Sequence, residues 1–256
     1  MGLGVFQTPP GGATERAVAA ALDAGYRHID TARIYQNEAS VGAAVRRSGL
    51  DRDSVFVTTK LWNDDHGFEA TLRAFERSRA ALGLDVVDLY LIHWPATGRR
   101  AETWRALEKL HADGACRSIG VSNFTVRHLT ELLATAEVPP AVNQVEFSPF
   151  LYQRELLELC RAHGIQLEAY SPLTRARRFQ EPVLQAIAAD HHATVPQVLL
   201  RWGLQHEVVV LPKSVDPGRI RENAGAFDLV LDPEEMARLD ALDAGFRVSW
   251  DPSEMP

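Results

Sequence analysis

Short apolar runs rich in β-forming residues alternate along this chain with segments of helical periodicity. Eight runs have the length of buried strands: Leu3–Phe6, His28–Ala32, Val55–Leu61, Val86–Trp94, Ser118–Ser122, Val142–Phe147, Gln166–Ser171 and Val208–Pro212. Strands that alternate with helices build right-handed βαβ units, in which neighbouring strands are parallel. Eight such units fit a closed barrel better than an open doubly wound sheet. We therefore expect one α/β domain, a (β/α)8 TIM barrel, over residues 1–256.

The intervening segments carry apolar residues at helical spacing. Thr14–Ala24 places Ala17, Val18, Ala21 and Leu22 on one face, and Phe68–Leu82 has an imperfect stripe of Leu72, Phe75, Arg79 and Leu82. Glycines stand where left-handed residues commonly end helices, at Gly25, Gly49, Gly83, Gly114 and Gly164. No Walker loop or complete dinucleotide-binding glycine motif is present.

Composition narrows the classes of partner. The formal net charge of −7 argues against nucleic acid or an anionic membrane surface. Cys116 and Cys160 are the only cysteines, which suits a reducing compartment and offers no zinc spacing. We expect a cytoplasmic protein, because no signal peptide and no apolar run of roughly 20 residues is present. We expect no metal, since no His-Glu-x-x-His motif occurs.

Four residues suited to proton transfer lie at or just beyond the ends of predicted strands: Asp30, Tyr35, Lys60 and His93. The carboxyl ends of barrel strands meet at one face, so these side chains can converge on one substrate. Reduction of a carbonyl by hydride creates an alkoxide that needs a proton, which Tyr35 could donate. Lys60 could lower the pKa of the phenol, Asp30 could hold Lys60, and His93 could polarise the carbonyl.

Each residue also has a structural explanation. Asp30 suits a buried cap or ion pair, Lys60 a strand-end lysine, Tyr35 a rim aromatic and His93 a core histidine. Their occurrence together at successive strand ends favours the catalytic interpretation.

Four segments resemble, in order, signature motifs of the aldo-keto reductase family: Gly25–Glu38, Leu91–Pro95, Gly120–Phe124 and Leu211–Val215. The pattern is similar to the prokaryotic branch that contains 2,5-diketo-D-gluconate reductases and aldehyde reductases. The resemblance extends from Gly2 to about Trp250. It implies a barrel that binds NADPH in extended form without a Rossmann domain. It also implies that Tyr35 is the acid/base, tuned by Lys60 and Asp30, with His93 orienting the carbonyl.

The resemblance further implies a set of cofactor-binding residues. Ser122, Asn123 and Gln144 would hydrogen-bond the nicotinamide carboxamide, with turn formation as the alternative role for the serine and asparagine. Tyr170 would stack on the ring, and Ser171 and Leu173 would follow the pyrophosphate.

Around the start of the last predicted helix, the resemblance implies a phosphate site. Lys213, Ser214 and Arg219 would bind the adenosine 2′-phosphate, and Glu222 and Asn223 would reach the adenine. A preference for NADPH over NADH follows. Asp216 departs from the family pattern: it would weaken this preference if it faced the phosphate, but we expect it to cap the following helix.

The resemblance places Phe6, Trp62 and Trp94, together with His93, around the substrate, and core packing is the alternative for Trp94. Phe150 and Trp250 are weaker candidates. Arg175, Arg177 and Arg178 could attract an anionic sugar acid, but a solvated loop is the favoured interpretation. The chain begins almost at the first strand, without the family's N-terminal β-hairpin plug, and the connection after His93 and the tail are short.

We expect an NADPH-dependent reductase of aldehydes and ketones, such as dicarbonyls, keto-sugar acids or aromatic aldehydes, acting as a monomer. One alternative is an NADPH-binding sensor or regulatory barrel with little turnover. Another is an isomerase or lyase that uses Lys213 and Ser214 as its phosphate site.

Overall fold

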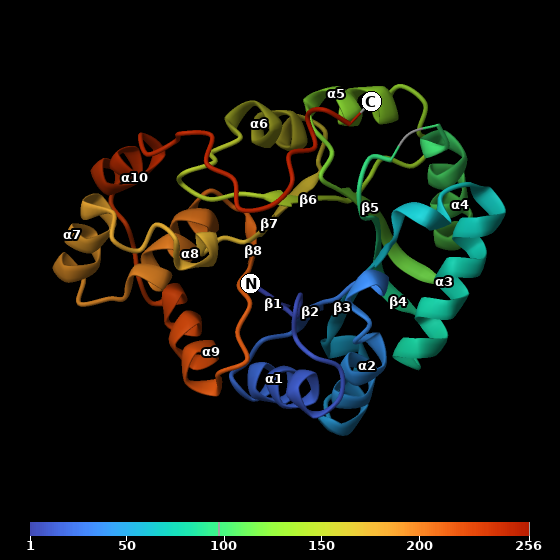
Figure 1. Ribbon diagram of the computed structural model, residues 1–256, viewed down its shortest axis with the longest axis horizontal. Helices are drawn as coiled ribbons and strands as arrows, with labels where there is room; N and C mark the ends of the chain where they lie inside the picture. The colour runs from blue at the N-terminus through green and yellow to red at the C-terminus, as the bar shows by residue number, and fades with distance from the viewer. Residues whose placement is uncertain (97, 256) are drawn as a thin grey trace.

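Eight parallel strands follow one another around the molecule in the order of the sequence (Figure 1). The computed structural model describes residues 1–96 and 98–255. The strands are β1 (Leu3–Gly4), β2 (His28–Asp30), β3 (Phe56–Leu61), β4 (Val87–Ile92), β5 (Cys116–Ser122), β6 (Val142–Glu146), β7 (Gln166–Tyr170) and β8 (Val209–Leu211). Seven of the eight predicted runs contain one of these strands, and the eighth, Ser118–Ser122, covers all of β5 except its first two residues.

Backbone hydrogen bonds between β1 and β8 close the sheet. The N–H of Gly2 donates to the carbonyl of Val210 at 2.9 Å, and the N–H of Gly4 donates to that of Pro212 at 3.0 Å. The predicted (β/α)8 barrel is therefore confirmed.

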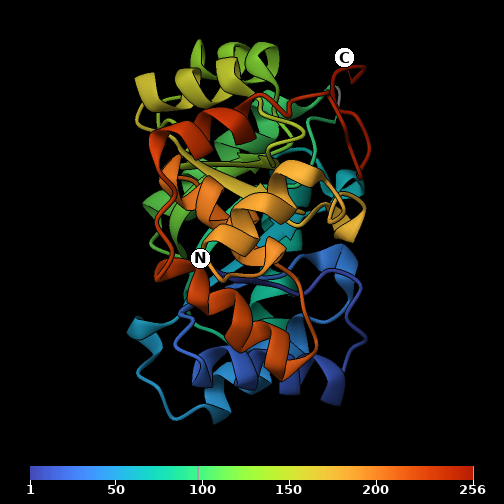
Figure 2. The ribbon, with the colours of Figure 1, turned by 90° about the vertical axis from the view of Figure 1, so that its left-hand side faces the viewer.

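Ten α-helices surround the strands in the described residues, as Figures 1 and 2 show. They are α1 (Gly12–Asp23), α2 (Glu38–Arg47), α3 (Phe68–Leu82), α4 (Arg100–Ala112), α5 (Val126–Leu133), α6 (Arg154–Ala162), α7 (Pro182–Asp190), α8 (Val195–Gln205), α9 (Pro217–Ala224) and α10 (Pro233–Asp240). None of the described helices is long and apolar enough to cross a membrane. Two helices, α7 and α8, separate β7 from β8, and α10 is additional to the regular alternation.

Helix α3 packs through a face that only partly coincides with the predicted stripe. Thr71, Ala74, Phe75, Ser78 and Leu82 are buried on α3. Leu72 is only partly buried, and Arg79 pairs with Glu76 at the surface. The stripe is confirmed at Phe75 and Leu82, Leu72 packs on the core at its edge, and Arg79 is the imperfection; small and hydroxyl side chains complete the buried face. Helices α2 and α3 approach each other closely, since a Cβ at Gly42 on α2 would lie 1.7 Å from the carbonyl oxygen of Leu82 on α3.

The helix-ending glycines behave as expected. Gly25, Gly49, Gly83, Gly114 and Gly164 have φ between 62° and 90°. Each chain reversal returns the backbone towards the next strand. The strand ends therefore gather at one face of the barrel, where the loops that follow them carry the polar residues.

The C-terminal segment runs back across that face. After α10 it passes over the ends of β6 and β7 and finishes beside α5 (Figure 1). There the imidazole Nε2 of His128 lies 2.9 Å from the carbonyl oxygen of Met255. The short tail thus covers part of the barrel mouth. In the connection after His93, Thr97 lies outside the described residues.

Candidate active site

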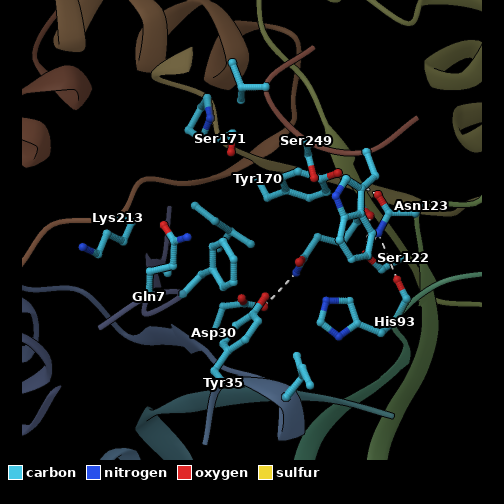
Figure 3. Close-up of a pocket in the computed structure, with 18 of the residues that line it drawn as sticks. Gln7, Asp30, Tyr35, His93, Ser122, Asn123, Tyr170, Ser171, Lys213 and Ser249 are labelled. Atoms are coloured by element: carbon cyan, nitrogen blue, oxygen red, sulfur yellow. Dashed lines mark hydrogen bonds between the residues drawn. The ribbon is translucent and has the colours of Figure 1, made fainter. Parts of the chain in front are cut away.

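A cavity of about 920 Å³ opens at the carboxyl ends of the strands. Asp30, Tyr35 and His93 line it, as do Ser122, Asn123, Gln144 and Tyr170, together with Ser171, Leu173 and Lys213. Figure 3 shows that the side chains of Asp30, Tyr35 and His93 surround a common space, with Lys213 on the opposite side. The structure therefore brings together strand-end residues that are far apart in the sequence.

Lys60 and Asp30 form a buried ion pair inside the barrel. Asp30 ends β2, and Lys60 lies on the neighbouring strand β3. The Lys60 ammonium donates to both carboxylate oxygens of Asp30, at 2.7 and 2.8 Å, and to the carbonyl of Thr31 at 2.8 Å. The lysine therefore has partners for all three of its N–H donors.

Tyr35 lies directly beside this pair. It ends a short 3₁₀ helix, Arg33–Tyr35, that follows β2. The Lys60 ammonium lies 5.2 Å from the centre of the phenol ring, and the His93 ring centre lies 5.7 Å from it. Acid, phenol, amine and imidazole thus occupy one end of the cavity.

The expected lowering of the Tyr35 pKa by Lys60 is wrong for this arrangement. Burial and the negative charge of Asp30 instead raise the pKa of the phenol well above its ordinary value of 10. The Lys60 charge is directed at Asp30 by hydrogen bonds, so the phenol sees an ion pair and not an isolated cation. Tyr35 is consequently protonated at neutral pH.

His93 is a neutral imidazole on the cavity wall. Burial, and then the Lys60 charge, lower the pKa of His93 well below 6.5. Its Nδ1 is buried and has no hydrogen-bond partner among the described residues, so Nδ1 does not face the cavity and Nε2 is the ring nitrogen that can reach it. The ring of Trp62 packs edge-on against it, with the ring centres 5.3 Å apart. In the tautomer protonated at Nε2, the ring can donate a hydrogen bond to a carbonyl oxygen in the cavity.

Ser122, Asn123 and Tyr170 form a hydrogen-bonded group at the ends of β5 and β7. The Ser122 hydroxyl donates to the carbonyl of Gln144 at 2.7 Å, and the Asn123 amide donates to the carbonyl of His93 at 2.9 Å. Tyr170 donates its hydroxyl proton to Asn123 Oδ1 at 2.8 Å. Asn123 adopts a left-handed backbone, with φ 63°, so it also has the turn-forming role considered as its alternative.

Gln144 joins two buried carboxylates. Its Nε2 donates to Asp30 Oδ2 at 2.8 Å and to Glu168 Oε2 at 2.9 Å. Both amide hydrogens are therefore used, and Oε1 has no hydrogen-bond partner among the described residues. Because Gln144 lines the cavity, Oε1 can accept a hydrogen bond from the amide of a nicotinamide carboxamide. This atom, with the Tyr170 ring nearby, fits the expected cofactor.

The expected phosphate-binding residues lie along the exit from β8. Lys213 is exposed and lines the cavity, while Ser214 and Arg219 lie further along the connection and on α9. Asp216 accepts the backbone N–H of Arg219 at 3.0 Å as the N-cap of α9, which confirms its predicted capping role.

The two expected adenine contacts lie outside this cavity. Glu222 accepts from the Thr194 hydroxyl at 3.0 Å, and Asn223 is buried with only 4% of its surface exposed.

Phe6, Trp62 and Trp94 all line the cavity, as expected of a substrate pocket. Trp250 lines it too and packs on Trp94, with ring centres 5.6 Å apart. The weaker expectation that Phe150 contacts the substrate is wrong, because Phe150 is 2% exposed, lies outside the cavity and packs in the core. Sequence reasoning missed several further cavity residues, among them Gln7, Ile34, Val248 and Ser249, because loops and the tail carry no periodic signal.

The arginine run divides into three different roles. Arg177 is exposed, as a solvated loop predicts, whereas Arg175 is exposed and lines the cavity. The Arg178 guanidinium lies 4.1 Å from the ring centre of Phe246 and 5.5 Å from that of Phe150. Arg178 therefore joins the loop after β7 to the C-terminal tail, which the solvated-loop interpretation did not predict.

Glu146, at the end of β6, holds the tail against the cavity. Its carboxylate accepts the backbone N–H groups of Val248 at 2.6 Å and Ser249 at 2.9 Å. Burial raises the pKa of Glu146, and these two hydrogen bonds partly oppose that rise. The tail residues that line the cavity are thus held by a buried carboxylate.

No group of three or more His, Cys, Asp or Glu side chains is placed to hold a metal ion in the described part of the chain.

Comparison with known proteins identifies the family of this chain. The family model described as "Aldo/keto reductase family" matches residues 7–244. A glyoxal reductase of Bacillus subtilis is 52% identical over 254 residues, which cover 99% of this chain and 92% of the relative. A morphine 6-dehydrogenase of Pseudomonas putida is 47% identical and covers 100% of this chain and 91% of the relative.

Solved structures show the same architecture. An aldo-keto reductase from a deep-sea metagenome library superimposes with a TM-score of 0.96 at 44% identity, covering 100% of this chain and 95% of that one. A Bombyx mori aldo-keto reductase solved with NADP has a TM-score of 0.91 at 36% identity, covering 97% and 90%. The chain belongs to the aldo/keto reductase family and is an oxidoreductase that acts on carbonyl or alcohol groups.

Proposed function

We propose that the protein is an NADPH-dependent reductase of small aldehydes and ketones, with Tyr35 as the proton donor. The observation that carries the proposal is the convergence of Tyr35, His93 and the Lys60–Asp30 pair on one cavity. The bound cofactor would supply the hydride. Gln144 Oε1 would receive its carboxamide, the Tyr170 ring would flank its nicotinamide, and Lys213 would supply positive charge towards its phosphates.

The protein's own residues then handle the carbonyl oxygen. The neutral His93 ring donates a hydrogen bond that orients and polarises the carbonyl. Tyr35 donates its proton to the oxygen as negative charge develops there. An alkoxide is a stronger base than a phenolate, so a phenol of raised pKa still protonates it. The Lys60–Asp30 ion pair lies beside the phenol, and its hydrogen bonds hold the two side chains in place.

The walls of the cavity favour small carbonyl compounds with an apolar or aromatic side. Phe6, Trp62, Trp94 and Trp250 give the cavity aromatic walls. Arg175 supplies a positive charge at the cavity and suits substrates that also carry a carboxylate. Similarity to a glyoxal reductase supports dicarbonyls within the same class.

The test is oxidation of NADPH with a panel of dicarbonyls, keto-sugar acids and aromatic aldehydes, beside the Tyr35→Phe variant. We expect turnover in the native protein and a loss of two orders of magnitude or more in kcat, roughly the range of general acid catalysis, in the variant. Tight NADPH binding without turnover of any carbonyl would instead support the sensor or regulatory alternative. Turnover that survives in Tyr35→Phe would refute the assigned proton donor.

A further inference from the structure

Glu168 is a buried carboxylate that the proposed reaction does not use. It lies on β7 with 3% of its surface exposed, and no salt bridge to it is found among the described residues. A single strong hydrogen bond, from Gln144 Nε2, reaches its Oε2 at 2.9 Å. Burying an ionisable group with so little compensation is costly, so its position calls for an explanation beyond packing.

Gln144 connects Glu168 to the catalytic end of the cavity. Gln144 and Glu168 are register partners on the adjacent strands β6 and β7, so both side chains enter the barrel. The second N–H of Gln144 donates to Asp30, the partner of Lys60. One amide is thereby held between two carboxylates, Asp30 on β2 and Glu168 on β7.

This arrangement fixes which atom of Gln144 faces a ligand. Two carboxylates accept its two amide hydrogens, so the amide nitrogen cannot also donate to a bound molecule. The carboxylates polarise the amide and increase the negative charge on Oε1, because hydrogen bonds in a chain strengthen one another. Oε1 is then a strong acceptor in a residue that lines the cavity.

We propose that Glu168 is a positioning residue that, through the Gln144 amide, makes the site bind the oxidised nicotinamide in preference to the reduced one. This inference rests on the proposed NADPH-dependent function. The oxidised ring is positively charged, which makes its carboxamide N–H a better donor to the polarised Oε1. The Glu168 carboxylate also places a negative charge next to Gln144, which attracts the positively charged oxidised ring. Both effects favour the state that remains after hydride has left.

The main test measures dissociation constants, not turnover. NADP⁺ and NADPH are titrated separately at pH 8, where Glu168 is mostly ionised, into the native protein and into Glu168→Gln, with quenching of tryptophan fluorescence as the readout. We expect the variant to bind NADP⁺ on the order of tenfold more weakly, because a negative charge close to the positively charged ring is lost, with NADPH changed much less. A residue that only supports the fold would weaken both cofactors equally.

Glu38→Gln is the matched control. Glu38 is also a glutamate with 3% exposure, but its carboxylate accepts from the Thr59 hydroxyl at 2.6 Å, away from Gln144. We expect its ratio of NADP⁺ to NADPH affinity to equal that of the native protein. A Glu38→Gln variant that shifts the ratio as far as Glu168→Gln does would overturn the inference.

Measuring the affinities of the native protein for both cofactors as a function of pH tests the same inference without a variant. It therefore remains decisive if Glu168→Gln fails to fold. Burial raises the pKa of Glu168 to about 7. Asp30 on β2, Lys60 on β3 and the amino group of Met1 are the charged groups that act on it. As the pH falls from 8 to 6, we expect the preference for NADP⁺ over NADPH to decrease as Glu168 takes up its proton.

The outcomes separate the inference from the proposed function. Binding of both cofactors with a ratio that neither the Glu168→Gln substitution nor pH alters would overturn the role of Glu168 alone. A native protein that binds neither cofactor would overturn the NADPH-dependent function and this inference with it.

Discussion

The ammonium of Lys60 lies 2.7 Å from Oδ1 and 2.8 Å from Oδ2 of Asp30, and both side chains are almost completely buried. This pair lies at the centre of the site, since Tyr35 packs beside it and Gln144 donates to it. Removal of one member leaves an uncompensated charge inside the barrel, which costs much more than the pair itself contributes.

The first prediction concerns the difference between removing one member of the Lys60–Asp30 pair and removing both. Lys60→Met should lower the free energy of unfolding by about 3–5 kcal/mol, because Asp30 remains charged and buried. The double variant Lys60→Met/Asp30→Asn should recover much of that stability while remaining inactive. Urea denaturation followed by circular dichroism measures both. A double variant no more stable than Lys60→Met would contradict the explanation.

The second prediction concerns the pH dependence of stability. The pKa of Glu168 is raised to about 7 from a usual value of 4.5, so the folded state binds its proton more tightly than the unfolded state. This contribution to stability is complete below pH 4.5 and is lost as the pH rises through 7. Glu168→Gln cannot ionise, so its stability relative to the native protein should increase by about 3 kcal/mol between pH 4.5 and 8.

Urea denaturation of both proteins across that pH range provides the measurement. Glu38→Gln again serves as the comparison, because its carboxylate has a direct hydroxyl donor. A difference between Glu168→Gln and the native protein that stays constant with pH would show that Glu168 does not titrate in this range.

The third prediction separates the capping role of Asp216 from a role in cofactor choice. Its carboxylate accepts the N–H of Arg219 at the start of α9, which lowers the pKa of Asp216. Asp216→Asn retains an oxygen for the cap and should leave both the melting temperature and the NADPH to NADH preference almost unchanged. Asp216→Ala should lower the melting temperature by about 2 °C.

Calorimetry and cofactor titration with NADPH and NADH test this pair of variants. An increase in NADPH preference of tenfold or more in Asp216→Asn, roughly the effect of one removed charge, would show that the carboxylate faces the phosphate after all.

The fourth prediction concerns the tail held by Glu146. The N–H of Val248, which Glu146 accepts, belongs to the peptide bond that trypsin cleaves after Arg247. Glu146→Ala should release this segment and accelerate cleavage there by about tenfold or more, because local opening controls proteolysis. The KM for bulky aldehydes should rise as Val248, Ser249 and Trp250 move from the cavity wall.

Cleavage after the exposed Arg177 serves as the internal reference for this experiment. Equal acceleration at Arg177 and Arg247 would indicate global loosening of the fold, not release of the tail.

Much of the site could be predicted because it lies where strands end. Apolar runs locate β2, β3 and β4, and parallel strands place their carboxyl ends at one face. Asp30, Lys60 and His93 therefore had to approach one another once the barrel was recognised. The Asp216 cap was equally accessible, since its hydrogen bond spans only three residues.

The sequence by itself determined the order of strands and helices, the helix-ending glycines and the residues delivered to the barrel mouth, because these depend on local periodicity and turn chemistry. Only the tertiary structure decided which faces meet across the barrel. Gln144 reaches Asp30 over 114 residues, and Glu146 holds Val248 over 102. The raised pKa of Tyr35 likewise follows from burial beside an ion pair. Such contacts depend on how the strands tilt and how side chains fill the interior, and no local pattern in the chain encodes either.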